Sequence, residues 1–185
     1  GLVWFEVQIK GKAAHASEPY KGINSFEHML LAAEELLELN KKISTRRSKY
    51  PTRRKKDRYS TMVLGGELCG GSKINMVPAR SVFSVDRRFI PEERLKDVKG
   101  EILRKISALN KSRRKLSIKI KIINQQDSAV SVMDNKFTSI FAKAVKRHTN
   151  KRAKFTIMAG ATDMRFLLKK GIPSFGYSVD GGGRY

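Results

Sequence analysis

The sequence has little cysteine, few acidic residues and no long apolar run. Cys69 is the only cysteine among 185 residues, so neither a disulfide within one chain nor a cysteine-based zinc site is possible. A single thiol is typical of a reducing compartment, and we expect a cytoplasmic protein. No apolar run approaches the roughly 20 residues that a membrane-spanning helix needs, and the N-terminus lacks the pattern of a signal peptide. The chain opens inside an expected strand and has no initiator Met, which predicts that it is cut from a longer protein.

Acidic residues are outnumbered by basic ones. The chain has 39 Lys and Arg against 17 Asp and Glu, which gives a formal net charge of +22. This balance predicts attraction to polyanions such as nucleic acid, acidic proteins or anionic membranes, but it carries no information about the fold. Hydrophobic residues make up 40% of the chain, which is enough to form a core and argues against wholesale disorder.

The pattern of apolar residues and turns in residues 1–125 predicts secondary-structure elements in the order β-α-β-β-α-β. The expected strands are residues 3–9, 60–68, 79–89 and 116–122, and the expected helices are residues 25–39 and 91–109. Asn24 followed by Glu27 is typical of a helix start, and we expect Phe26, Leu30, Ala33 and Leu37 to form the apolar stripe of that helix. Two helices on one face of a four-stranded antiparallel sheet give a ferredoxin-like domain, the α+β part of an α/β protein.

The pattern changes after Gln125. We expect a helix at residues 134–148, then short strands at 155–158 and 174–177 on either side of a helix at 162–170 that Gly171 ends. A strand, a helix and a strand in so few residues predict a parallel βαβ unit. A parallel pair needs more sheet and more helices than residues 126–185 can supply. This region is therefore expected to be an incomplete part of an α/β domain.

A strongly basic segment separates the first helix from the second strand. Ten of the eighteen residues from Lys41 to Arg58 are Lys or Arg, and Pro51 with the scarcity of large apolar residues predicts an exposed loop. The segment is either a polyanion-binding arm, with Tyr50 and Tyr59 to stack on bases, or a solvated and mobile insertion. Both interpretations remain open at this level.

Candidate functional residues are few. His15 stands among small residues in G-K-A-A-H-A-S-E-P, on a loop between a strand and a helix, where it is either functional or an ordinary loop histidine. His28 and His148 fit structural roles. The polar candidates that remain are Asn75, Arg87 or Arg88 as an anion clamp, and the turn from Gly160 to Asp163.

Four ordered motifs carry a resemblance. They are G-K-A-A-H-A-S-E-P with G-I-N, G-G-S-K-I-N-M-V-P-A-R, V-D-R-R-F-I-P, and G-A-T-D-M-R-F-L followed by G-I-P-S-F-G-Y. Together they resemble the acetylornithine deacetylase, succinyl-diaminopimelate desuccinylase and carboxypeptidase G family of di-zinc amidohydrolases, over nearly the whole chain.

The resemblance implies that residues 1–125 are a lid domain that forms a homodimer and that residues 126–185 are the C-terminal part of the catalytic domain. His15 would cross the dimer and polarise the carbonyl of a small N-acyl amino acid. Asn75, Arg88, Gly160 and Arg165 would contact the substrate, the last two from the catalytic domain.

The chain departs from the family in its metal site. The family's ligands for two zinc (or cobalt) ions lie upstream of the lid and just after the final strand, so we expect no metal ligand in this chain and no activity of the fragment alone. Ala161 replaces a hydroxyl residue of some desuccinylases, which weakens any inference about the acyl group. The alternative function is a basic nucleic-acid or acidic-protein binding module that uses the loop at residues 41–58.

Overall fold

The chain forms two compact units. The computed structural model describes residues 1–113, 115–160 and 162–177. Unit 1 comprises Gly1–Ser48 and Tyr59–Ser128, and unit 2 comprises Lys49–Arg58 and Ala129–Tyr185. The second part of the basic segment, Lys49–Arg58, therefore groups with the C-terminal region, which no sequence pattern indicated.

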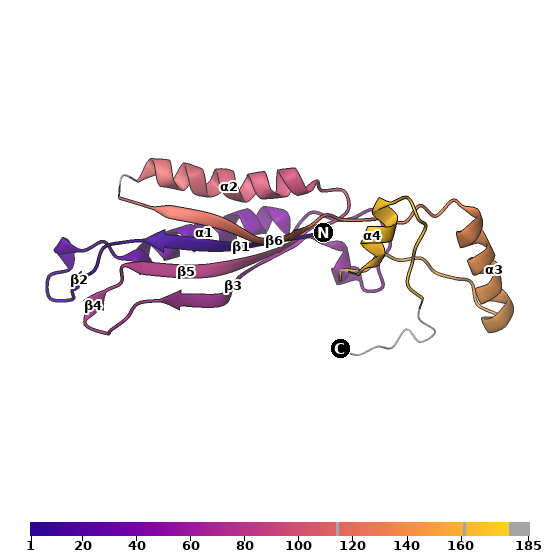
Figure 1. The fold of residues 1–185 in the computed structure, drawn as a ribbon, viewed down its shortest axis with the longest axis horizontal. Helices are drawn as coiled ribbons and strands as arrows, with labels where there is room; N and C mark the ends of the chain where they lie inside the picture. Colours follow the sequence, from indigo (N-terminus) through magenta and orange to yellow (C-terminus); the bar gives the residue numbers. More distant parts are fainter. Residues whose placement is uncertain (114, 161, 178–185) are drawn as a thin grey trace. The chain divides into compact units, whose positions relative to one another are not determined.

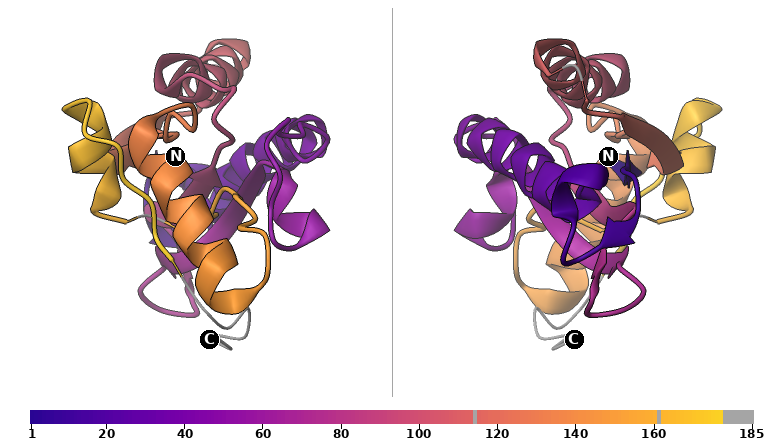
Figure 2. Two further views of the ribbon diagram at one scale, coloured as in Figure 1. Left: turned by 90° about the vertical axis from the view of Figure 1, so that its right-hand side faces the viewer. Right: turned by 90° about the vertical axis from the view of Figure 1, so that its left-hand side faces the viewer.

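Unit 1 is built on a four-stranded antiparallel sheet with the strand order β3-β5-β1-β6. These strands are β1 (Leu2–Lys10), β3 (Thr61–Gly70), β5 (Arg80–Arg88) and β6 (Ile118–Gln126). Helices α1 (Ser25–Ile43) and α2 (Leu95–Ser112) lie on the same side of the sheet (Figures 1 and 2). The predicted ferredoxin-like arrangement is confirmed.

The core of unit 1 follows the period of the strands. Val3, Phe5, Val7 and Ile9 are buried against the helices, while Trp4 on the opposite face is 39% exposed. Alternation of this kind is what a sheet with one covered face requires. The helix side is completed from α2 and the other strands by Val98, Ile102, Ile106, Phe83 and Val85.

Helix α1 begins as predicted but buries a different face. The side chain of Asn24 accepts hydrogen bonds from the backbone of Phe26 and Glu27, which confirms the cap. The predicted core stripe was wrong for three of its four residues, and only Ala33 packs against the core, where it is partly buried. The residues that pack on the sheet are Met29, Ala32, Leu36 and Ile43, whereas Phe26, Leu30 and Leu37 are 48%, 52% and 51% exposed. Both stripes are apolar at helical spacing, so the position of the sheet decides which one is covered.

Helix α2 starts later than predicted. Pro91 and the two glutamates that follow it precede the helix, whose first residue is Leu95. Two short antiparallel strands, β2 (Ala14–His15) and β4 (Met76–Val77), lie beyond the end of β1 and form a separate ladder. Two 3-10 helices, η1 (Pro19–Lys21) and η2 (Lys55–Arg58), complete the elements outside the C-terminal region.

Unit 2 contains helices α3 (Lys136–Thr149) and α4 (Met164–Lys169). Phe175 packs against Phe137, Phe141 and Phe155, with ring centroids 4.8 to 6.1 Å apart. Gly171 follows α4 with φ +76° and its N–H donates to Leu168 O at 3.0 Å, which confirms it as the helix end.

The expected strands of unit 2 do not form within the residues that the structure describes. Residues 155–158 hold one parallel bridge, between Ile157 and Thr52, and residues 174–177 hold none. A parallel pair needs neighbouring strands and helices on both of its faces. The described part of unit 2 offers only two α-helices and the short 3-10 helix η2, so the βαβ prediction is wrong for these residues.

Candidate functional site

His15 and Asn75 lie together at one end of unit 1. The chain leaves β1 at Lys10 and forms β2, in which His15 pairs with Met76 of β4. One residue further on, the N–H of Ala16 donates to Asn75 O at 2.9 Å. Two candidates that are sixty residues apart in sequence are thus held by one short ladder, where the sequence predicted only a loop.

Two glycines permit the close backbone contacts that shape this end. Lys12 and Ile23 exchange backbone hydrogen bonds of 2.9 Å in both directions. A Cβ on Gly11 would lie 2.1 Å from Ile23 O, and a Cβ on Gly22 would lie 2.9 Å from Lys12 O. Any side chain at either position would force the loop open, so these glycines fix the path that presents His15.

The ring of His15 is exposed and oriented by Ser17. The backbone N–H of Ser17 donates to His15 Nδ1 at 3.3 Å, and Ser17 Oγ lies 2.7 Å from the same nitrogen. A neutral imidazole that accepts at Nδ1 carries its proton on Nε2. The arrangement therefore presents an N–H donor toward solvent, which is the chemistry needed to polarise a carbonyl.

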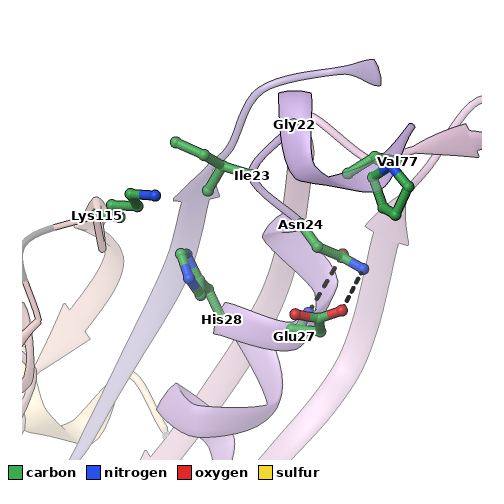
Figure 3. Close-up of a pocket in the computed structure, with 8 residues that line it drawn as sticks. Gly22, Ile23, Asn24, Glu27, His28, Val77 and Lys115 are labelled. Atoms are coloured by element: carbon green, nitrogen blue, oxygen red, sulfur yellow. Dashed lines mark hydrogen bonds between the residues drawn. The ribbon is translucent and has the colours of Figure 1, made fainter. Parts of the chain in front are cut away.

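A surface pocket of about 280 Å³ lies beside this loop, at the start of α1 (Figure 3). Asn24 Nδ2 donates to Glu27 Oε1 at 2.9 Å at its rim. His28 is half-buried, and its Nδ1 has no hydrogen-bond partner among the described residues. The residues lining the pocket are Pro19, Gly22, Ile23, Asn24, Glu27, His28, Val77 and Lys115.

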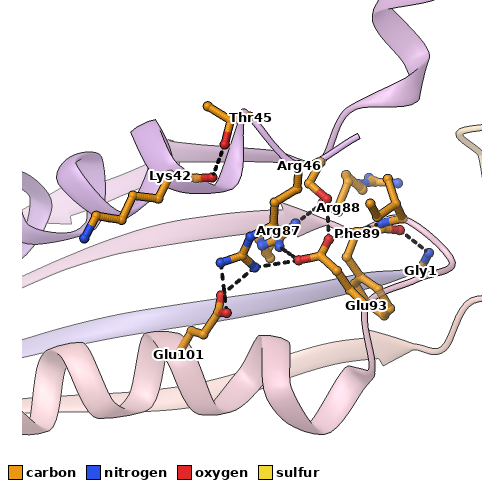
Figure 4. Close-up of polar contacts among 11 residues, drawn as sticks. Gly1, Lys42, Thr45, Arg46, Arg87, Arg88, Phe89, Glu93 and Glu101 are labelled. Atoms are coloured by element: carbon orange, nitrogen blue, oxygen red, sulfur yellow. Dashed lines mark hydrogen bonds and ion pairs between the residues drawn. The ribbon is translucent and has the colours of Figure 1, made fainter. Parts of the chain in front are cut away.

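Arg87 and Arg88 point to opposite faces of the sheet. Arg87 is fully buried on the helix side, where its Nη2 lies 2.5 Å from Glu93 Oε1 (Figure 4). Burial lowers the pKa of its guanidinium, although the charge of Glu93 opposes that shift. An arginine in this position stabilises the fold and has no access to a ligand.

Arg88 is the candidate that remains accessible. Its side chain is 38% exposed, with Nε 2.8 Å from Asp86 Oδ1 and Nη2 2.8 Å from Asp86 Oδ2. This two-point contact holds the guanidinium in one orientation. The sequence analysis missed Asp86, although residues two apart on a strand share a face and the D-x-R spacing carried that signal.

Glu93 is the centre of a wider buried network, also missed at the level of sequence. It accepts from Arg46 Nη1 at 2.7 Å and from Ser60 Oγ, and Arg46 Nη1 also donates to Glu101 at 3.0 Å. Desolvation raises the pKa of Glu93, but the hydrogen bonds from Ser60 and Arg46 and the charge of Arg87 outweigh it and leave the pKa below its ordinary value. The network ties Arg46, within the basic segment, and Ser60, just after it, to Glu93, which lies just before α2.

Gly160 and Arg165 lie in unit 2. Arg165 Nη1 donates to Thr162 O at 2.9 Å, and its guanidinium carbon stands 4.4 Å from the centroid of the Phe166 ring. The side chain is 21% exposed and Asp163, 3.9 Å away, is 94% exposed. Gly160 is exposed, and Ala161 falls outside the described residues. Arg165 is therefore held on its own turn.

Within the described ranges, no three His, Cys, Asp or Glu side chains come close enough together to hold a metal ion. The described residues therefore do not fit a zinc site. No helix in the same ranges has the length and apolar character required to cross a membrane.

Comparison with known proteins relates the chain to M20 peptidases. Residues 1–114 match the family model M20_dimer, described as a peptidase dimerisation domain. The acetylornithine deacetylase of Pasteurella multocida is 31% identical over 109 residues, which cover 59% of this chain and 28% of that enzyme.

Solved structures share the fold. A tripeptidase from Staphylococcus aureus superposes with a TM-score of 0.59 at 18% identity, over 93% of this chain and 41% of its own. A hydantoinase/carbamoylase family amidase from Burkholderia ambifaria gives 0.61 at 19% identity, over 93% of this chain and 38% of its own. The chain spans less than half the length of these relatives.

Proposed function

The chain belongs to the M20 peptidase dimerisation-domain family, and we propose that its parent protein is a zinc-dependent amidohydrolase that removes the acyl group from an N-acyl amino acid. Succinyl-diaminopimelate and acetylornithine represent the proposed substrate class. In this proposal residues 1–125 are the lid, residues 126–185 belong to the catalytic domain, and the ligands for two zinc or cobalt ions lie in other parts of the parent. The single cysteine supports a cytoplasmic location.

The observation that carries the proposed dimeric site of this enzyme is the distance between the candidate residues in unit 1. Arg88 ends β5 opposite Leu2, whereas Arg80 begins it opposite Lys10, next to the loop of His15. Eight residue steps of about 3.3 Å separate these ends by about 26 Å. A small N-acyl amino acid is shorter than this separation, which supports a site that takes His15 and Arg88 from different copies.

A second copy supplies the missing half if it pairs along β3. This strand is an edge of the sheet and runs from Thr61, opposite Arg88, to Gly70, near the end that carries His15. Two β3 strands paired antiparallel about a two-fold axis would bring His15 of one copy beside Arg88 of the other. The site would then be shared between subunits.

Exposed apolar side chains on α1 and on the edge strand β3 support this interface. Helix α1 exposes Phe26, Leu30 and Leu37 in one stripe, and β3 exposes Val63 and Leu68, which are 60% and 66% accessible. Unpaired strand edges and exposed apolar side chains are both typical of protein interfaces. A homodimer that covers this surface would bury the stripe that the sheet leaves uncovered.

Each candidate residue would then contact a different part of the substrate. His15 would donate from Nε2 to the scissile carbonyl, with Asn75 as a substrate contact from the same subunit. Arg88, oriented by Asp86, would bind the substrate carboxylate, and Gly160 and Arg165 would add contacts from the catalytic domain.

Mixed dimers of the parent enzyme test the shared site. We would co-express two inactive subunits, His15→Ala and Arg88→Ala, and measure turnover of an N-acyl amino acid. If each site takes His15 from one subunit and Arg88 from the other, half of the dimers have one intact site and about a quarter of the activity returns. Activity no higher than that of the separate variants would contradict the proposal.

The oligomeric state of the 185-residue chain tests the interface separately. We expect a dimer by analytical ultracentrifugation, and a monomer when Leu30→Glu and Leu37→Glu are combined. Leu103→Glu on α2, where the side chain is 41% exposed, is the matched control and should leave the dimer intact. This purified chain should show no hydrolysis with added zinc, and measurable turnover would overturn the assignment of the metal ligands to other parts of the parent.

A further inference from the structure

Unit 2 carries an excess of positive charge that the proposed hydrolase does not use. Its described residues include sixteen Lys or Arg and three Asp or Glu. No acidic residue occurs between residues 135 and 162. Unit 1 has about twice as many described residues but much better balanced charges, so the excess is a local property of unit 2.

The fold joins two basic segments that are a hundred residues apart. Thr52 forms a parallel bridge with Ile157, and the N–H of Ile157 donates to Pro51 O at 2.9 Å. Arg53 follows that bridge directly. Lys154 precedes it by three residues, a distance of about 10 Å along an extended chain. The segments R-R-K-K and K-R-A-K therefore lie close together on one unit.

Six exposed cations define this basic surface: Arg53, Lys55, Lys56, Lys151, Arg152 and Lys154. Among the described residues none of them forms an ion pair, and the nearest acid in sequence, Asp57, is bound by Arg54 Nε at 3.0 Å. Like charges held this close repel one another and destabilise the unit that carries them. A bound polyanion would relieve that repulsion and release the anions that screen it.

We propose that the basic surface of unit 2 binds the phosphate backbone of a nucleic acid, without reading its sequence. Duplex nucleic acid carries one charge per about 1.7 Å of its axis and a condensed layer of counterions, so cations that neutralise its phosphates gain free energy from counterion release. An acidic peptide has a lower charge density and offers less of this gain. Phe155, 36% exposed and next to Lys154, adds a ring on which an unpaired base can stack.

Fluorescence anisotropy with the 185-residue chain and a labelled 20-base-pair DNA duplex tests the proposal over a salt series. Each neutralised phosphate contributes about −0.9 to the slope of log K against log salt, so six contacts give about −5. The combined variant Arg53→Gln, Lys55→Gln and Lys56→Gln should lower the affinity at least about tenfold at low salt and make the slope shallower by about 2 to 3.

The matched control removes the same charge from unit 1. Lys96, Lys111 and Lys119 are equally exposed, and their combined change to Gln should alter the affinity less than about threefold. Circular dichroism of both variants checks that the fold is retained. Equal losses in the two variants would show that net charge alone drives binding, and would overturn the proposal.

Binding of two other polyanions distinguishes a nucleic-acid surface from one that binds an acidic protein or a membrane. Polyglutamate and vesicles with anionic lipid should bind more weakly than the duplex at the same salt concentration. Tighter binding of either one, with the same loss in the unit 2 variant, would assign the surface to an acidic protein or a membrane. Hydrolysis by the parent enzyme should be unchanged in the unit 2 variant, so this test is independent of the proposed reaction.

Discussion

The two units differ in how much apolar surface they bury. Unit 1 buries a continuous apolar cluster between its sheet and helices, including Phe5, Leu36 and Ile102 at 0% exposure. In the described part of unit 2 no apolar side chain is fully buried, and Phe137, Ile140 and Phe166 are 49%, 56% and 54% exposed. Hydrophobic burial is the main favourable contribution to folding, so unit 1 should be the more stable of the two.

Charge separates the units in the same direction. In unit 1 the ion pairs of Arg87 and Arg46 with Glu93 are largely removed from water. In unit 2 the described pairs, Arg54 with Asp57 and Arg165 with Asp163, lie at the surface. The comparison indicates that interior contacts determine the structure of unit 1, whereas the charged side chains on the surface of unit 2 are available for binding.

The largest difference between the units should come from the buried charges. Glu93→Gln removes the main charge partner of Arg87, and breaking a buried pair typically costs about 3 to 5 kcal/mol. Asp163→Asn, which removes an exposed partner of Arg165, should leave the free energy of unfolding unchanged within error. Urea titration measures both, and equal effects would remove the distinction between the units.

The next largest effect should come from matched core substitutions. Ile102→Ala in α2 creates a cavity at a fully buried position and should cost about 2 to 5 kcal/mol. Ile140→Ala in α3 makes the same chemical change at an exposed position and should cost less than about 0.5 kcal/mol. Thermal and urea unfolding of the two variants sharpens the comparison, since only the location of the isoleucine differs.

A smaller effect is expected from pH. The folded state lowers the pKa of Glu93, so its contribution to stability is present above the ordinary pKa near 4.5 and is lost as pH falls through the lower folded value. The difference in stability between the wild-type chain and Glu93→Gln should therefore be largest near pH 6 and shrink below pH 4.5. A difference that is constant across this range would contradict the lowered pKa.

The smallest effect should come from two glycines with the same backbone conformation. Gly71 in unit 1 has φ +73° and Gly171 in unit 2 has φ +76°, and a Cβ at either would meet no atom within 4 Å. Alanine at each position costs about 1 kcal/mol of backbone strain alone. Hydrogen exchange should show that Gly71→Ala lowers the free energy of global unfolding of unit 1. Gly171→Ala should instead lower the free energy of local opening around α4.

Several features followed from the sequence because their causes are local. Alternation placed Val3, Phe5, Val7 and Ile9 on one face of a strand. Asn24 began α1 because its side chain can accept hydrogen bonds from the next turn. The β-α-β-β-α-β order led directly to the ferredoxin-like arrangement of unit 1. Gly171 ended α4 because glycine adopts a positive φ without strain.

Other features were decided by contacts between distant segments. The sequence contained two apolar stripes on α1, and only the packed sheet chose Met29 and Leu36 over Leu30 and Leu37. The residue pattern left the choice between Arg87 and Arg88 open, and only the family resemblance indicated Arg88. The burial of Arg87 depends on which face of the sheet the helices cover. Pairing of Thr52 with Ile157 likewise joined two basic segments that no periodicity connects.

By itself the sequence determined the order of elements in unit 1, the cap of α1 and the identity of the candidate residues. The tertiary structure alone decided that His15 and Asn75 lie together and that Arg88 stands at the other end of the sheet. The physical reason is the range of the interactions: caps and periodicities act within a few residues, whereas strand pairing and burial depend on parts of the chain that meet only after folding.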